Sequence, residues 1–143
     1  MQLIFNYPHL FHPGSDPAEN SYALNAELEK LIGVNMTYLR LRKMNGYSVP
    51  PLYDSGVVYG RTLWWEPIPA LYERRSGDCK SLTSALVAEY RLNGIRCRPV
   101  FRFVPKPDGS TDYHILVQTM RGFEDPSKIL GMTEENAPFF ALR

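Results

Sequence analysis

The chain lacks the features that mark several large classes of protein. It has only two cysteines, Cys79 and Cys97, among 143 residues, which is too few for the disulfide framework of a small secreted domain. No stretch approaches the roughly 18 consecutive apolar residues that a membrane-spanning helix needs. The first five residues are apolar but lack the cationic region of a secretory signal. We therefore expect a soluble cytoplasmic protein with reduced thiols and no membrane partner; a single Cys79–Cys97 disulfide is the alternative.

An excess of charge of one sign is also missing. The 16 Lys and Arg residues nearly balance the 15 Asp and Glu residues, so the formal net charge is +1. Proteins that bind nucleic acid non-specifically draw their affinity from many uncompensated cations, so we expect no nucleic-acid partner. The hydrophobic fraction of 44% and the charged fraction of 22% are typical of a globular protein. The length fits one domain, which we place at residues 1–143.

The first 50 residues are expected to form an N-terminal helical part. Asp16-Pro17 is a helix start, because Asp can cap the unpaired N–H groups and proline suits the first helical position. Apolar residues with roughly helical spacing predict that this helix ends near Gly33, and a second helix is expected over 36–43. The apolar set is Tyr22, Leu24, Leu28, Leu31 and Ile32.

The segment 48–70 is expected to be rich in loops. It carries four prolines and two glycines, and only 56–59 has the composition of a short strand. A long loop-rich segment of this kind often covers a binding site as a lid.

The pattern of residues 51–143 predicts the remaining core of an α+β fold. Ser76-Gly77-Asp78 is turn and cap chemistry before a helix over 79–92. Alternating apolar and basic residues then predict a strand over 95–104. The turn Asp108-Gly109 leads to a second strand over 112–119, and a third strand over 123–125 is stopped by proline. Hairpin connections between successive strands give an antiparallel sheet with the helix packed on it.

Three residues of this core have the types and places that a nucleophilic triad requires. Cys79 opens a helix, where the positive end of the helix dipole stabilises a thiolate and lowers the thiol pKa into the range of roughly 3.5–7.5. His114 lies in the middle of a strand that this helix covers, so its ring can act as general base and acid. Asp125 follows across a short turn, opposite or diagonal to His114, where it would orient the ring. Each residue has a structural explanation as well: Cys79 and His114 as core packing, and Asp125 as a strand terminator.

The donors that would stabilise an oxyanion are harder to assign. The backbone N–H of Cys79 is a natural donor at a helix start. We consider Trp64 or Trp65 as the second donor, although a tryptophan pair is equally well explained by packing. Gln118 shares the sheet face of His114 and is a further candidate.

Other features are weaker candidates for a function. His9 and His12, with Asp16 nearby, lack the further ligands of a recognised metal site, so we expect no metal. We interpret Cys97 as a buried strand residue. The arginines of the strand over 95–104 form one basic face, and the apolar tail over 137–142 is expected to dock on its own domain.

The segments around the three candidate residues resemble the transglutaminase-like cysteine enzyme superfamily, which has a papain-like core. The resemblance extends loosely from about residue 52 to residue 132. Its details, including 52–57 and 124–132, are similar to small transglutaminase-like proteins of phages and prophages. The matching motifs are Ser76-Gly77-Asp78-Cys79-Lys80-Ser81-Leu82, Asn93-Gly94-Ile95-Arg96-Cys97-Arg98-Pro99, Tyr113-His114-Ile115-Leu116-Val117 and Glu124-Asp125-Pro126-Ser127.

The resemblance implies a Cys-His-Asp catalytic triad formed by Cys79, His114 and Asp125. It implies cysteine-dependent acyl transfer, or hydrolysis of an amide or peptide bond in a peptide or protein substrate, with no cofactor. Lys80 stands where eukaryotic-type transglutaminases usually have Trp, and superfamily members with this shorter pattern include peptidases and amidases. The alternative is a catalytically silent member that acts as a phage structural, assembly or binding protein, located in the host cytoplasm or the virion and contacting phage structural proteins.

Overall fold

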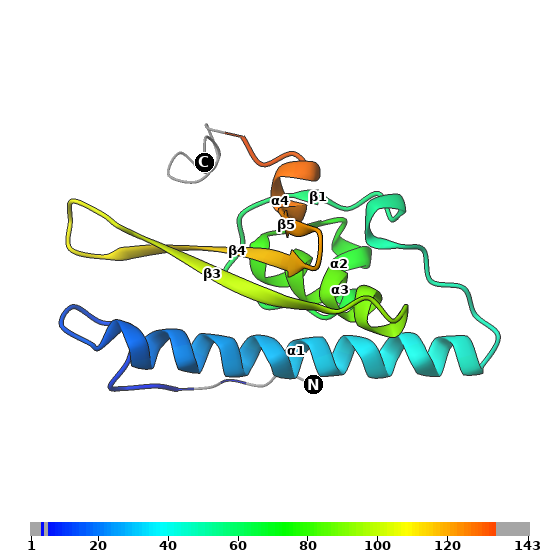
Figure 1. Cartoon of the computed structure of the whole chain (residues 1–143), viewed down its shortest axis with the longest axis horizontal. Helices are drawn as coiled ribbons and strands as arrows, with labels where there is room; N and C mark the ends of the chain where they lie inside the picture. The colour runs from blue at the N-terminus through cyan, green and yellow to red at the C-terminus, as the bar shows by residue number, and fades with distance from the viewer. Residues whose placement is uncertain (1–3, 5, 134–143) are drawn as a thin grey trace.

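The fold is built around a central helix, α3, which is covered by other elements on all sides. The computed structural model describes residue 4 and residues 6–133. Figure 1 shows the long helix α1 along one side of α3 and the sheet on another. The elements in chain order are α1 (Pro17–Met44), η1 (Leu52–Asp54), β1 (Val58–Tyr59), α2 (Ile68–Arg74), β2 (Ser76–Gly77), α3 (Cys79–Leu92), β3 (Cys97–Pro105), β4 (Thr111–Thr119), β5 (Gly122–Glu124) and α4 (Pro126–Ile129).

The N-terminal part is one helix, so the prediction of two helices is wrong. Asp16 caps α1 as expected, since its carboxylate accepts from the backbone N–H of Ala18 at 2.8 Å. Gly33 does not end the helix, because a glycine in a helix interior costs only about 1 kcal/mol relative to alanine. Packing on both sides of Gly33 outweighs that cost, because Ile32 and Asn35 are fully buried.

Asn35 connects α1 to two other helices. Its side-chain oxygen accepts from the backbone N–H of Ile68 at 2.8 Å, and its amide donates to the hydroxyl of Ser84 at 3.2 Å. These bonds satisfy a buried polar side chain on both its functional groups. Asn35 therefore fixes α1 against the start of α2 and against the middle of α3.

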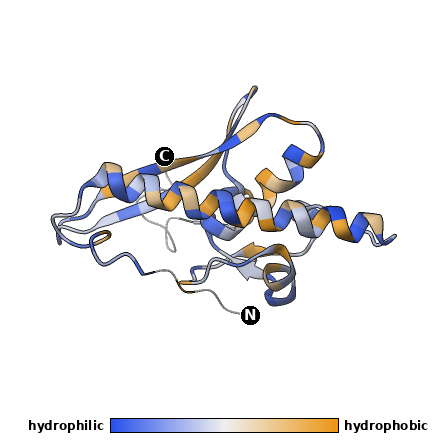
Figure 2. Ribbon diagram, turned by 90° about the horizontal axis from the view of Figure 1, so that it is seen from below, coloured by the Kyte–Doolittle hydropathy of each residue, from blue (hydrophilic) through white to orange (hydrophobic). Residues whose placement is uncertain are grey.

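Only part of the predicted apolar stripe of α1 faces the core. Leu28 and Ile32 are buried, whereas Tyr22 is 81% exposed. Figure 2 looks onto the outer side of α1, where hydrophobic residues interrupt the polar surface. Val34 and Leu41 of α1 are about half exposed. The helix is thus held by few apolar contacts together with the Asn35 bonds.

Helix α2 (Ile68–Arg74) begins in the segment 48–70, which was expected to be rich in loops, and continues through residues for which no element was predicted. Its prolines are compatible with a helix because Pro67 is the N-cap and Pro69 stands in the first turn, where no backbone hydrogen bond is lost. Ile68 and Leu71 are fully buried and hold the helix on the core. The sequence pattern missed α2 because prolines at a helix start resemble those of a loop.

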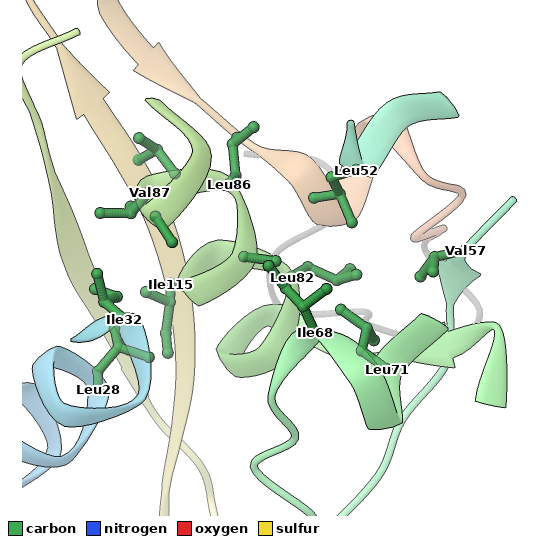
Figure 3. Packing of buried hydrophobic residues seen from close by; sticks show 13 residues of the cluster. Leu28, Ile32, Leu52, Val57, Ile68, Leu71, Leu82, Leu86, Val87 and Ile115 are labelled. Carbon is green, nitrogen blue, oxygen red and sulfur yellow. The ribbon is translucent and has the colours of Figure 1, made fainter. Parts of the chain in front are cut away.

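The antiparallel sheet has the strand order β3-β4-β5, and its elements are close to those predicted. His114 pairs with Arg102 on one side of β4, and Val117 pairs with Glu124 on the other. Ile115 and Val117 face α3 and pack with its leucines, as Figure 3 shows for Ile115, Leu82 and Leu86. The mixed helices and antiparallel sheet confirm the α+β fold class.

A short parallel pair of strands, β1 and β2, leads the chain into α3. Val58 pairs with Ser76 and Tyr59 with Gly77. A Cβ atom at Gly77 would lie 2.5 Å from Leu71 Cδ1, so only glycine allows β2 to approach α2 this closely. This pairing fixes the backbone directly before Cys79, the first residue of α3.

Candidate active site

Cys79 lies at the positive end of a rigid helix. It is the first residue of α3, and the side chain of the N-cap residue Asp78 does not cap the helix. The first N–H groups of a helix have no acceptor within the helix, so the N–H groups in the first turn of α3 are left without an intrahelical partner. The helix is buried from Ser81 to Ala88, which holds the thiol in place.

His114 and Asp125 form a hydrogen-bonded pair. His114 is only 3% exposed, and its Nε2 lies 2.8 Å from Oδ2 of Asp125. Val117 pairs with Glu124, the last residue of β5, so Asp125 directly follows the paired residues. Of the two predicted positions, opposite or diagonal to His114, this pairing leaves the diagonal one. Because the carboxylate accepts a hydrogen bond at Nε2, this nitrogen carries the proton and Nδ1 is the basic nitrogen of the neutral ring.

Asp125 is itself held in a fixed position. It is the N-cap of α4, and its Oδ1 accepts from the backbone N–H groups of Ser127 at 3.0 Å and Lys128 at 3.3 Å. One carboxylate oxygen therefore binds the helix start while the other orients His114. The sequence predicted the contact with His114 but not α4, whose single turn is too short to give a periodic pattern.

The thiol of Cys79 is next to the strand that carries His114. The backbone N–H of Ile115, the residue after His114, donates toward the sulfur. Cys79 and His114 both line one cavity of about 600 Å³. The structure thus places Cys79 and His114 on the wall of one cavity and Asp125 against His114, on three separate elements.

The electrostatic surroundings of Cys79 contradict the expected low thiol pKa. Burial raises the pKa of Cys79 to about 12, and the carboxylate of Asp78 adds to the rise. The ammonium of Lys80 and the N–H of Ile115 act in the opposite direction but are outweighed. The helix-dipole argument considered only the local chain and omitted the buried carboxylate beside the sulfur. Cys79 is a neutral thiol at neutral pH, so its use as a nucleophile needs a base.

We expect no thiolate absorbance from Cys79 near 240 nm at pH 7, measured as the difference between the wild type and Cys79→Ala. The folded-state pKa lies above the ordinary value of 9.0, so the absorbance should grow only as the pH rises from about 9 toward 12. In this window the raised pKa also makes folding less favourable with rising pH. Cys97→Ala is the control, and a Cys79-dependent absorbance at neutral pH would contradict a neutral thiol.

The structure separates the three candidates for the second oxyanion donor. Trp65 lines the cavity, whereas Trp64 is 54% exposed and does not. Gln118 is also outside the cavity lining, and its side-chain oxygen accepts from Arg98 Nε at 2.8 Å. Gln118 shares the sheet face of His114, as predicted, but it lies farther along β4 and pairs with Phe123 of β5. A shared face was therefore not sufficient to bring Gln118 into the cavity that contains Cys79.

Several cavity residues were not identified as site residues from the sequence. Lys80 forms an ion pair with Asp78 and donates to the backbone oxygen of Thr62 at 2.6 Å. The backbone N–H of Thr62 in turn lies 3.4 Å from the same carboxylate. These contacts tie the segment after β1 to the start of α3. The signal in the sequence was Lys80 itself, whose charge directly follows the cysteine.

The weaker candidates do not gather into a second site. Within residue 4 and residues 6–133, no group of three or more His, Cys, Asp and Glu side chains is placed to hold a metal ion; Nδ1 of His12 lies 2.9 Å from the backbone oxygen of Pro13. Cys79 and Cys97 are both free thiols, so the alternative of a disulfide is wrong. The apolar tail over 137–142 lies outside the described residues. No helix in the described part of the chain has the length and apolar character to cross a membrane.

The comparison with protein families gives the class of the protein. The family model of the Transglutaminase-like superfamily matches residues 18–123, which include Cys79 and His114 and end two residues before Asp125. The chain belongs to the Transglutaminase-like superfamily, as the motifs around Cys79 predicted. No curated protein and no solved structure matches the chain.

Proposed function

We propose that the protein is a cysteine-dependent enzyme that acts on amide or peptide bonds through Cys79, His114 and Asp125. The observation that carries the proposal is the pairing of a buried His114 with Asp125 at 2.8 Å, beside a cysteine that lines the same cavity. A buried histidine needs a hydrogen-bond partner whatever its role, so the cavity that His114 shares with a cysteine is what favours catalysis over packing. Superfamily membership independently supports cysteine-dependent catalysis.

The neutral thiol requires that proton transfer accompany the attack. Cys79 Sγ forms a bond to the carbonyl carbon while its proton passes to Nδ1 of His114. The tetrahedral intermediate collapses, and the leaving amine takes this proton from His114. The resulting thioester is attacked by water or an amine, whose proton passes to Nδ1 and then to the departing sulfur. Asp125 stabilises the imidazolium formed in both halves of the reaction.

The cavity supports a peptide or protein amide as the substrate. Its volume of about 600 Å³ falls within the range of small-molecule sites, roughly 300–1,000 Å³. Aromatic side chains and both signs of charge line it, including Trp65, Arg61 and Asp112. This mixture suits a polar peptide group flanked by apolar atoms. None of the steps above needs a cofactor.

The open cavity also favours the enzyme over the alternative of a catalytically silent assembly or binding protein. In a silent member, the segment 48–70 or the C-terminal tail would be expected to fill the space above the cysteine, and the tail lies outside the described residues. Here Arg61, Thr62 and Trp65 of that segment form the wall of the cavity instead.

The proposal is tested by capture of the acyl-enzyme. We expect that p-nitrophenyl acetate, followed by an acid quench, leaves one acetyl group on Cys79, detected by mass spectrometry of the peptides. The Cys97→Ala variant should acetylate equally, and Cys79→Ala should lose the adduct. Equal acetylation of both cysteines, or none at Cys79, would count against the proposed function.

A further inference from the structure

A tyrosine that the sequence did not single out lies in the wall of the cavity beside Cys79. Tyr59 is the last residue of β1 and pairs with Gly77, two residues before Cys79. Its backbone N–H donates to the oxygen of Leu130 at 2.7 Å, and the next N–H, of Gly60, donates to Gly77 at 2.9 Å. Tyr59 is therefore held between β2 and the end of α4, with little freedom to move relative to Cys79.

The hydroxyl of Tyr59 is an unused hydrogen-bond donor. Within residue 4 and residues 6–133, it donates to no other group, although the side chain is half-buried and lines the same cavity as Cys79 and His114. Burial and then the nearby charge of Cys79 raise the pKa of Tyr59 to about 12. The hydroxyl is thus protonated at neutral pH, and its side chain shares the cavity wall with Cys79.

An acyl-transfer site needs donors aimed at the oxygen that becomes negative when the carbonyl is attacked. The backbone N–H of Cys79, in the first turn of α3, is one such donor. Of the two neighbours of Cys79 in sequence, Asp78 is a carboxylate that would repel the oxyanion, and the ammonium of Lys80 is engaged with Asp78 and the backbone oxygen of Thr62. A second donor therefore has to come from another residue that lines the cavity, and Tyr59 is such a residue.

We propose that the Tyr59 hydroxyl, together with the backbone N–H of Cys79, forms the oxyanion hole. This inference rests on the proposed function. As the bond between Cys79 Sγ and the carbonyl carbon forms, the π electron pair moves onto oxygen and the thiol proton passes to His114. The Tyr59 O–H then donates to the negative oxygen without losing its proton. When the intermediate collapses, the C=O bond re-forms and the hydroxyl is released.

The test compares two reactions of the same sulfur in the Tyr59→Phe variant. An N-acetylated dipeptide aldehyde adds to Cys79 to give a tetrahedral thiohemiacetal, whose oxygen occupies the oxyanion position. Alkylation by iodoacetamide at pH 9 forms no oxyanion. We expect the inhibition constant of the aldehyde to rise at least tenfold, and kcat to fall about 10²-fold with little change in KM. The alkylation rate should stay within about twofold.

Each outcome separates this inference from competing ones. The ratio of aldehyde affinity to alkylation rate is taken within each variant, and thermal unfolding of each variant is followed because unfolding would lower the affinity and expose the thiol to alkylation. Tyr72→Phe removes the hydroxyl of another half-buried tyrosine, which donates to Pro50 outside the cavity, and should leave the ratio unchanged. An unchanged ratio in Tyr59→Phe would overturn the inference. A fall in the ratio that occurs only in Trp65→Phe would overturn it as well. If the wild type forms neither thiohemiacetal nor acetyl-enzyme, the proposed function itself fails.

Discussion

Replacing His114 with alanine is expected to lower kcat/KM by about 10⁶-fold, to the level of the protein without Cys79. In catalytic triads that act as a unit, removing the base costs about as much as removing the nucleophile. The loss of activity should be especially large in this protein, because burial and the carboxylate of Asp78 keep the thiol of Cys79 protonated at neutral pH. Hydrolysis of p-nitrophenyl acetate measures the effect, with His114→Ala, Cys79→Ala and the double variant compared.

Two controls distinguish loss of the base from loss of the fold. Removing His114 leaves the carboxylate of Asp125 without its 2.8 Å partner, so thermal unfolding of each variant must be followed alongside activity. Added imidazole should restore part of the activity of His114→Ala but none of that of Cys79→Ala. If His114→Ala retained most of its activity while folded, His114 would not be the base.

Replacing Asp125 with asparagine is expected to lower kcat about 10⁴-fold, the loss seen when a triad carboxylate becomes an amide. The amide oxygen can keep the bonds from the N–H groups of Ser127 and Lys128, so α4 retains its cap. Its NH₂ group then faces Nε2 of His114 and favours the tautomer with the proton on Nδ1. That tautomer cannot accept the proton of the Cys79 thiol.

Asp108→Asn is the matched control for this variant. Asp108 is also a carboxylate that accepts from a backbone N–H two residues later, at 2.9 Å from Ser110, but it lies on the exposed hairpin between β3 and β4. Its substitution should leave kcat within about twofold. The effect of Asp125→Asn should appear in kcat rather than in unfolding temperature. A kcat near that of the wild type would show that Asp125 only caps α4.

Local patterns were sufficient to predict the elements that carry the site. The turn residues before and after 79–92 predicted α3 with the bounds that the structure has. The turns and the alternation in the strands predicted the antiparallel order β3-β4-β5 but left open whether Asp125 would lie opposite His114 or diagonal to it. These features depend on backbone preferences and on a period of two or 3.6 residues, which a sequence displays directly.

Elements stabilised by distant partners were missed or divided. The continuity of α1 through Gly33 depends on Asn35 bonding to α2 and α3, residues more than 30 positions away. α2 is held by buried Ile68 and Leu71, although its prolines resemble those of a loop. No local pattern shows which side chain will meet a partner so far along the chain.

The sequence by itself determined which residues have the chemistry of the site: a cysteine at a helix start, a histidine within a strand and an aspartate after a short turn. Only the tertiary structure decided the state of the thiol and the surroundings of the oxyanion. The pKa of Cys79 depends on burial and on Asp78, and the candidacy of Tyr59 depends on the pairing of β1 with β2. Electrostatic energies and hydrogen bonds depend on distances in space, and these are set when separate segments pack together.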